Sequence, residues 1–153
     1  MTQGGGLSVV TVRIGAQEFA VDIRSVRELR GWTPPTPLAH APAYVQGMVD
    51  LRGVVIPIID LGARLGLAPI AATATSVIVV AQIKGRLAGL LVDGVNDLIE
   101  LGRDQLQPTP ATGSLAPNAV IQGVFQIEGR VLSLVALDSL VPADLGEPLR
   151  RAS

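Results

Sequence analysis

A chain of 153 residues predicts about one domain, and the lack of cysteine excludes disulfides, thiolate catalysis and cysteine-ligated zinc. The net charge of −1 gives no general attraction to nucleic acid or anionic lipid. Hydrophobic residues make up 48% of the chain but aromatic residues only 3%, so Val, Ile, Leu and Ala must build the core, and the low charged content of 16% predicts exposed apolar surface of the kind that marks partner sites.

The first part of the chain favours strands. Residues 1–6 are typical of a flexible tail and lack the plan of a signal peptide. Alternating apolar residues predict a strand over 7–14 and another over 18–23, joined by a turn. Residues 22–28 fit either a single helical turn or a bulged strand, and the sequence leaves both open. Gly31 ends this element.

Residues 32–42 contain four prolines and predict an extended connection that takes no part in a strand ladder. Residues 43–46 fit a short helix. Two strands follow, joined by a tight turn at Arg52-Gly53 in which the glycine takes a positive φ. Residues 54–59 are apolar at both odd- and even-numbered positions, which predicts a strand with both faces buried. Pro57, however, has no backbone N–H to donate and favours an edge strand. A strand paired on one side only would satisfy both.

The second half of the chain repeats the first. Residues 61–67 predict one or two helical turns closed by Gly66, and the uncharged segment 68–75 is the predicted linker. A hairpin over 76–92, with its turn at Lys84-Gly85, matches residues 7–23 at an offset of 69. Residues 122–137 match 46–61 at an offset of 76, so the second copy carries about seven extra residues, within 102–118.

The duplication predicts an all-β fold of two similar five-stranded units with short helical turns. Units of this size usually close as small barrels, which hides their strand edges. The predicted subdomains are 7–67 and 76–141, with 142–153 as a second tail and with exchange of strands between the two barrels allowed. A shared hydrophobic interface is expected because each unit alone would be marginal.

No residue pattern indicates catalysis, a metal or a cofactor. His40, the only histidine, lies in the proline-rich loop and is expected to be solvated. Residues 93–97 superficially resemble a calcium loop but lack its ligand spacing and predict a turn. Asp50 and Asp60 are expected to be solvated turn residues. The sequence therefore predicts a protein that is not an enzyme.

Glu28 and Arg52 allow two interpretations. They are charges in otherwise apolar strand contexts, each close to a glycine. They are either exposed charges at strand ends, worth little if they pair, or a bidentate ion pair that orders a binding rim. The spacing does not decide between the two.

Three motifs carry a family resemblance. Residues 22–31 (DIRSVRELRG), 45–61 (VQGMVDLRGVVIPIIDL) and 92–97 (VDGVND) together resemble CheW, the bacterial chemotaxis coupling protein. The resemblance covers about 7–141. The chain departs from the family in Asp50, where asparagine is more frequent, and in the proline-rich loop 32–42.

The resemblance implies two packed SH3-like barrels and an adaptor without catalytic activity or cofactor. Such an adaptor couples the cytoplasmic hairpin tips of chemoreceptors to the regulatory domain of the histidine kinase CheA. It works in the cytoplasm, at receptor arrays on the inner face of the membrane, without entering the membrane or binding nucleic acid. A peptide- or ligand-binding barrel of another kinase signalling system is the alternative.

The resemblance also places the binding surfaces. The implied receptor groove is lined by Ile23, Val26, Glu28, Arg52 and Val95. The kinase-binding surface is expected on the second barrel, near Leu90 and Val92.

Overall fold

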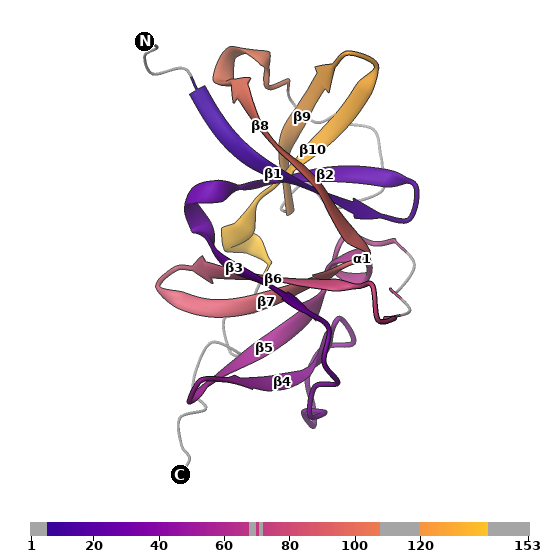
Figure 1. Ribbon diagram of the computed structural model, residues 1–153, viewed down its shortest axis with the longest axis vertical. Coiled ribbons are helices and arrows are strands. Elements are labelled where there is room, and N and C mark those ends of the chain that lie inside the picture. Colours follow the sequence, from indigo (N-terminus) through magenta and orange to yellow (C-terminus); the bar gives the residue numbers. More distant parts are fainter. Residues whose placement is uncertain (1–5, 68–69, 71, 108–119, 141–153) are drawn as a thin grey trace.

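Two stacked five-stranded sheets make up the protein (Figure 1). The computed structural model describes residues 6–67, 70, 72–107 and 120–140. Sheet A has the strand order β8-β1-β2-β10-β9. Its strands are β1 (Gly6–Ile14), β2 (Gln17–Asp22), β8 (Gly94–Gly102), β9 (Ile121–Ile127) and β10 (Arg130–Val135).

Sheet B has the order β3-β6-β7-β5-β4. Its strands are β3 (Val26–Gly31), β4 (Val45–Leu51), β5 (Val54–Asp60), β6 (Val77–Ile83) and β7 (Arg86–Val92). The described helical segments are short: α1 (Leu61–Arg64), and the 3-10 turns η1 (Ile23–Ser25), η2 (Arg103–Gln105) and η4 (Leu137–Ser139). The predicted all-β fold of two similar five-stranded units is confirmed.

The strand orders of the two sheets superimpose element by element. The offsets of 69 and 76 residues pair β8 with β3, β1 with β6, β2 with β7, β10 with β5 and β9 with β4, and this is the order in which the strands stand in sheets A and B. The parallel contacts correspond as well, because β10 lies parallel to β2 and β5 parallel to β7. The duplication seen in the sequence is therefore also present in the fold, because the two sheets have the same arrangement of strands.

The two copies exchange their first hairpins. β1 and β2 pair with strands of the second half, and β6 and β7 pair with strands of the first half. The predicted subdomains 7–67 and 76–141 describe the repeat along the sequence, whereas each sheet takes strands from both. Part of the predicted linker and most of the predicted seven-residue insertion lie outside the described residues.

Irregularities repeat together with the strands. Arg27 is skipped in the β3–β6 register, and Asn96, 69 residues later, is skipped in the β1–β8 register. Gln46 and Gln122 are skipped in the same way. Such bulges re-aim the side chains beside them.

The predicted hairpin turns are also present. Arg52, Lys84 and Glu128 take positive φ, each followed by a glycine that does the same. Two consecutive residues with positive φ form the type I′ turn that suits the twist of a hairpin.

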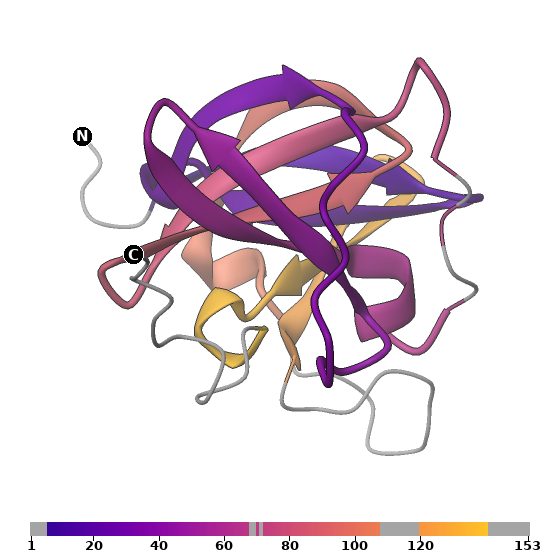
Figure 2. The same cartoon turned by 90° about the horizontal axis from the view of Figure 1, so that it is seen from below.

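The main core joins the two sheets. Val10 and Val12 of β1 pack in this core together with residues of β5, β6 and β7, whereas Val9 points the other way, into a smaller core formed within sheet A around Phe125. β1 is therefore buried on both faces. In the view from below, β4 and β5 lie in front of β1 and β2 (Figure 2).

The last described segment lies between the sheets. Leu137 and Leu140 of the η4 region are buried in the main core. The guanidinium of Arg64, at the end of α1, donates to the carbonyl oxygens of Ser139 (2.5 Å) and Leu140 (3.0 Å). These bonds tie the end of one copy to the corresponding helical turn of the other, because η4 lies 76 residues after α1.

The conflict over Pro57 is resolved by the register. Pro57 pairs with Met48 of β4, while the parallel contact of β5 with β7 begins one residue later, at Ile58. The proline thus sits where the strand has only one neighbour. Val54 and Val55 at the start of β5 are exposed, so the predicted two-sided burial holds only for the later part of the strand.

Several local predictions were wrong. Residues 43–46 form a turn that enters β4 rather than a helix. The proline-rich loop does join a ladder, because Thr36 and Met48 exchange two backbone hydrogen bonds of 2.8 Å. Residues 94–97 belong to β8 rather than to a turn. Asp60 is buried: one carboxylate oxygen accepts from Ala63 N–H at the start of α1 and the other from Ile70 N–H.

Candidate partner-binding face

The edge strands β3 and β8 build the candidate face. Each bulge shifts the alternation of side chains by one residue, so that Val26 and Leu29 of β3 stand opposite the core residues Ala81 and Val79 of β6. Without the bulge, two side chains three residues apart would point to opposite faces.

The same arrangement recurs on β8. Val95 and Leu98 stand opposite the core residues Val12 and Val10 of β1, with the skipped Asn96 between them. We define the junction face as Ile23, Val26, Leu29, Val95 and Leu98.

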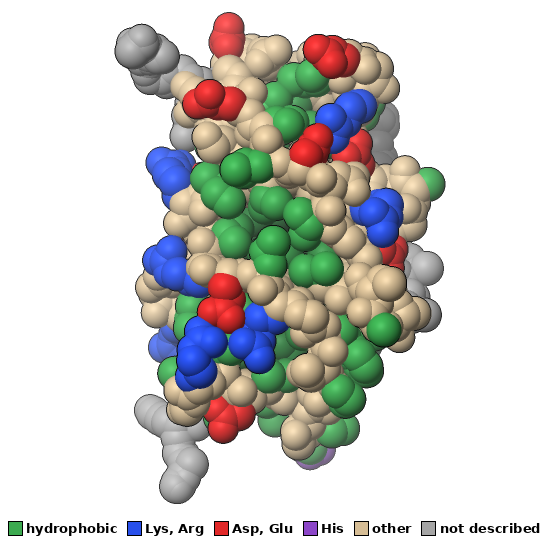
Figure 3. All heavy atoms as spheres, in the orientation of Figure 1, with side chains coloured by type: hydrophobic (Ala, Val, Ile, Leu, Met, Phe, Trp, Pro, Cys, Tyr) green, Lys and Arg blue, Asp and Glu red, His purple; other side chains and the backbone are tan. Residues whose placement is uncertain are grey.

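The junction face combines half-buried residues with exposed ones. Ile23, Val26 and Val95 are half-buried and pack on the main core. Leu29 and Leu98 are 49% and 63% exposed. The space-filling view shows apolar side chains gathered at the centre of the molecule, where the two sheets meet (Figure 3). Exposed apolar surface of this kind usually marks a protein contact.

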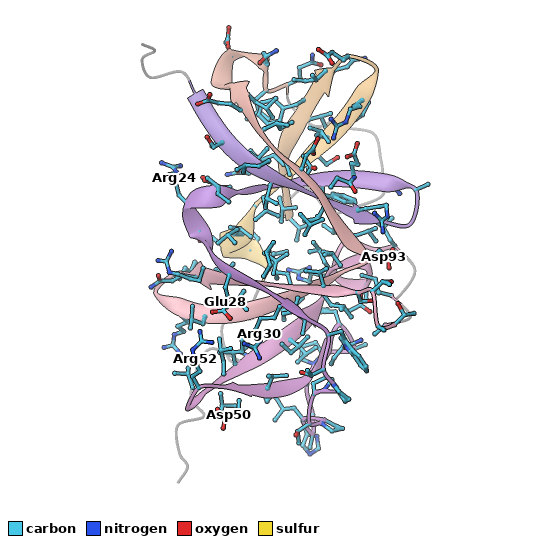
Figure 4. All side chains as sticks on the ribbon, in the orientation of Figure 1. Arg24, Glu28, Arg30, Asp50, Arg52 and Asp93 are labelled. Atoms are coloured by element: carbon cyan, nitrogen blue, oxygen red, sulfur yellow. The ribbon has the colours of Figure 1, made fainter. Side chains whose placement is uncertain are left out.

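Charged residues lie beside this face. Glu28 lies on β3 and Arg52 in the β4–β5 turn, and the guanidinium donates to the carboxylate at 2.5 and 3.5 Å. Arg30 donates to the same carboxylate at 3.2 Å (Figure 4). The hydrogen bond from Arg52, and then that from Arg30, lowers the pKa of Glu28. The ion pair left open by the sequence is therefore formed, although Arg52 is 67% exposed.

A second ion-pair cluster occupies the equivalent place in sheet A. Asp97 lies 69 residues after Glu28, and Arg130 donates to it at 3.3 Å. Arg130 also donates to Glu18 of β2 at 2.7 and 3.1 Å. The buried hydroxyl of Thr11 donates to Asp97 and accepts from its backbone N–H. Sequence reasoning missed this cluster, although the offset that relates Glu28 to Asp97 could have indicated it.

The Arg130 cluster predicts a stability loss in acid. Hydrogen bonds lower the pKa of Glu18, through Arg130, and that of Asp97, through Thr11 and then Arg130. Carboxylates with a lowered native pKa stabilise the fold above their unfolded pKa, and this stabilisation is lost as the pH falls through the native value. It is therefore fully present above about pH 4.5 and declines below it.

Replacing Arg130 with Met should lower the free energy of unfolding by about 1 kcal/mol at pH 7, because water screens a partly exposed pair. The difference from the unmodified chain should shrink between pH 4.5 and pH 3. Urea unfolding at both pH values measures it, and a difference that grows in acid would contradict the assignment.

The predicted receptor-groove residues are brought together on one side of the molecule. Ile23, Val26 and Val95 line the junction face, and Glu28 and Arg52 form the ion pair beside it. Leu29 and Leu98 were missed because, without a bulge, the alternation of β3 and β8 places them on the wrong face.

Leu90 and Val92 lie elsewhere. Both side chains are wholly buried in the main core, so neither can itself touch a partner while the fold is intact. A kinase-binding surface near them stays a prediction.

Asp50 and Asp93, which were considered for catalysis or metal binding, accept hydrogen bonds from backbone N–H groups of the fold. Asp93 accepts from Gly15 N–H at 2.6 Å, and Asp50 accepts from Gly53 N–H within its hairpin turn. Among the residues that the structure describes, no group of three or more His, Cys, Asp or Glu could hold a metal ion. None of the helices in this described part is long and apolar enough to cross a membrane.

An exposed apolar face built from two edge strands and accompanied by ion pairs has the form of a protein-docking surface. Fold and face together define an all-β interaction domain.

Comparison with known proteins identifies the family. The CheW-like domain model matches residues 8–144. The chain is 49% identical to "Chemotaxis protein CheW" of Rhizobium meliloti (strain 1021) over 92% of this chain and 90% of that protein. It is 30% identical to the Klebsiella aerogenes protein of the same name, over 91% and 84%.

A solved structure agrees with this assignment. The scaffolding protein TtCheW from Thermoanaerobacter tengcongensis matches with a TM-score of 0.81 and 26% identity, over 88% of this chain and 91% of that one. The chain therefore belongs to the CheW-like family, as the sequence motifs indicated.

Proposed function

We propose that this chain is a non-enzymatic chemotaxis adaptor that couples chemoreceptors to the histidine kinase CheA. The junction face receives the helical hairpin tip of the receptor, and another part of the surface contacts the kinase. The protein works in the cytoplasm, at receptor arrays on the inner face of the membrane.

The observation that carries the proposal is the junction face itself. Its half-buried residues sit on the core that joins the two sheets, so the face has a fixed shape before a partner arrives. Its exposed leucines supply apolar contact area of the kind that an amphipathic helix covers. The relatives named as chemotaxis proteins, and the solved relative named as a scaffolding protein, support the same role.

Replacing Val26 with Glu tests this role. A carboxylate at this position would lose its water when a helix covers the face. We expect receptor-tip binding to weaken at least tenfold, measured by pull-down with the purified cytoplasmic hairpin of a chemoreceptor, while far-UV circular dichroism stays unchanged. Val131→Glu adds the same charge at an exposed position beside the β9–β10 turn and should bind normally. Normal binding by a well-folded Val26→Glu protein would refute the assignment of the face.

Exchanging the charges of Glu28 and Arg52 tests whether the ion pair orders this face. Each single reversal places like charges side by side, so each should weaken receptor binding. The double variant Glu28→Arg with Arg52→Glu restores an opposite-charge pair and should recover part of the loss. Losses that simply add would show that the two residues act independently.

A further inference from the structure

Positive charge is concentrated on η1, on the edge strand β3 and at the two hairpin turns of sheet B. Arg24 lies in η1, Arg27 and Arg30 in β3, and Arg52, Lys84 and Arg86 at or beside the two hairpin turns of the same sheet. We define these six residues as the basic edge. In Figure 4, Arg24 and Arg52 lie at the left of the molecule, Arg30 lies nearer its middle, and Asp93 lies at the right.

The basic edge stands against the charge of the rest of the chain. It holds six of the chain's 12 basic residues, and the acidic residues among them are Asp22, Glu28 and Asp50. The edge therefore carries a net charge of +3 in a chain whose net charge is −1, which leaves −4 for the remainder. Segregation of this kind attracts a partner of opposite charge over a distance of about a Debye length.

Half of these cations have no carboxylate partner within the described residues. Arg27 donates to the neutral amide oxygen of Gln82 and to the carbonyl oxygen of Arg24. Lys84 and Arg86 are exposed and form no ion pair with any described residue. Among the described residues, no neighbouring carboxylate therefore neutralises their charge. Arg27 also directly follows Val26, so the basic edge is continuous with the junction face.

We infer that the basic edge is a docking surface for an acidic stretch of a protein partner, adjoining the apolar contact made at the junction face. This inference rests on the proposed function, because it describes the partner that the junction face binds. Asp22 and Glu28 hold Arg24, Arg30 and Arg52 in fixed directions. Arg27, Lys84 and Arg86 supply the positive charge that is left to pair with carboxylates of a partner. A lipid surface would instead favour uniform positive charge, without acidic residues in the same patch.

The basic edge should act mainly on the association rate. Charges at the rim of an interface steer encounter and set its salt dependence, whereas the apolar centre sets the dissociation rate. Replacing Arg27, Lys84 and Arg86 together with Gln removes three positive charges without touching the Glu28 ion pair. At low salt we expect association with an immobilised chemoreceptor hairpin to slow about tenfold, with dissociation nearly unchanged.

Surface plasmon resonance between 20 and 500 mM salt measures the association and dissociation rates. The unmodified chain should lose its advantage over the triple variant as salt rises. The matched control for the single variant Arg27→Gln is Arg13→Gln, which removes one exposed positive charge on the side where Asp93 lies. Arg13→Gln should change the association rate at low salt much less than Arg27→Gln does. Equal association rates of the triple variant and the unmodified chain at low salt would overturn the inference.

A second measurement separates this inference from the proposed function. NMR titration of the labelled chain uses a helical peptide of Glu and Leu and its counterpart of Gln and Leu. Chemical-shift changes at the basic edge that appear with the Glu peptide and not with the Gln peptide support the inference. They do so even if no receptor hairpin binds; failure of the hairpin to bind would refute only the proposed function. Absence of these shifts, or equal shifts with the Gln peptide, overturns the inference. The inference is also overturned if the chain binds phosphatidylglycerol vesicles as strongly as it binds the Glu peptide, with this binding sensitive to salt and lost in the triple variant.

Discussion

Replacing Phe125 with Ala is expected to lower the free energy of unfolding by about 3–5 kcal/mol, the range for removing a buried phenylalanine. Phe125 is wholly buried and is the largest side chain in the small core of sheet A. It stands opposite Leu132 of β10 in the strand register. The surrounding residues are aliphatic, mostly leucines, and nearly all are held on strands, so they can fill little of the cavity.

The measurement is urea unfolding followed by circular dichroism. Val131→Ala, which shortens a 55% exposed side chain on the next strand, is the matched control and should change the free energy of unfolding by no more than about 0.5 kcal/mol. A loss below about 1 kcal/mol for Phe125→Ala would mean that the core around it is not packed as described.

The damage should also reach sheet B. β1 and β2 belong to sheet A but are covalently continuous with β3 of sheet B, and β7 of sheet B leads directly into β8 of sheet A. The two parallel contacts, β10 with β2 and β5 with β7, likewise join the two halves of the chain. Neither half can complete a sheet alone, so we expect a single unfolding transition. Hydrogen exchange in Phe125→Ala should therefore accelerate in both sheets.

The duplication was the most informative signal in the sequence. Recurring glycines and apolar residues at fixed offsets predicted which strands correspond, because a copied hairpin keeps its turn residues. The pairing between strands was not predictable in the same way. Whether β2 pairs with β10 or with β5 depends on the packing of the finished fold, and a repeated sequence offers both partners equally well. Exchange of the hairpins could be allowed for but not predicted.

The candidate site shows a similar division. Ile23, Val26 and Val95 were placed by the family resemblance, and the structure gathers them at the junction of the sheets. Leu29 and Leu98 were missed because the sequence allowed a bulged strand over 22–28 without locating the bulge at Arg27, and nothing in it indicated a bulge at Asn96. Asp60 was assigned to solvent although its capping bond to Ala63 N–H is local, because its second partner, Ile70 N–H, lies ten residues away.

Replacing Gly47 with Ala should destabilise the protein by roughly 3 kcal/mol, through backbone strain and steric overlap. Gly47 has φ +149°, a conformation that residues with a side chain rarely adopt. A methyl group there would overlap the carbonyl oxygen of Thr36 and lie 2.7 Å from its carbonyl carbon. That contact is backbone, so no side chain can turn aside to relieve it. Gly31→Ala is the matched control, because its Cβ would meet nothing within 4 Å.

The effect of Gly47→Ala should appear first in the proline-rich loop. Thr36 is anchored on β4 by its two hydrogen bonds with Met48, the residue after Gly47, and a methyl group would push the loop away from β4. Trp32, the only tryptophan, lies at the start of this loop and packs on the main core. Its fluorescence should therefore shift to longer wavelength in Gly47→Ala and stay unchanged in Gly31→Ala. An unshifted spectrum together with normal stability would show that the loop does not depend on this close approach. Gly123→Ala should be milder: its methyl group would also collide with a backbone carbonyl, that of Gln107, but Gly123 does not need a positive φ.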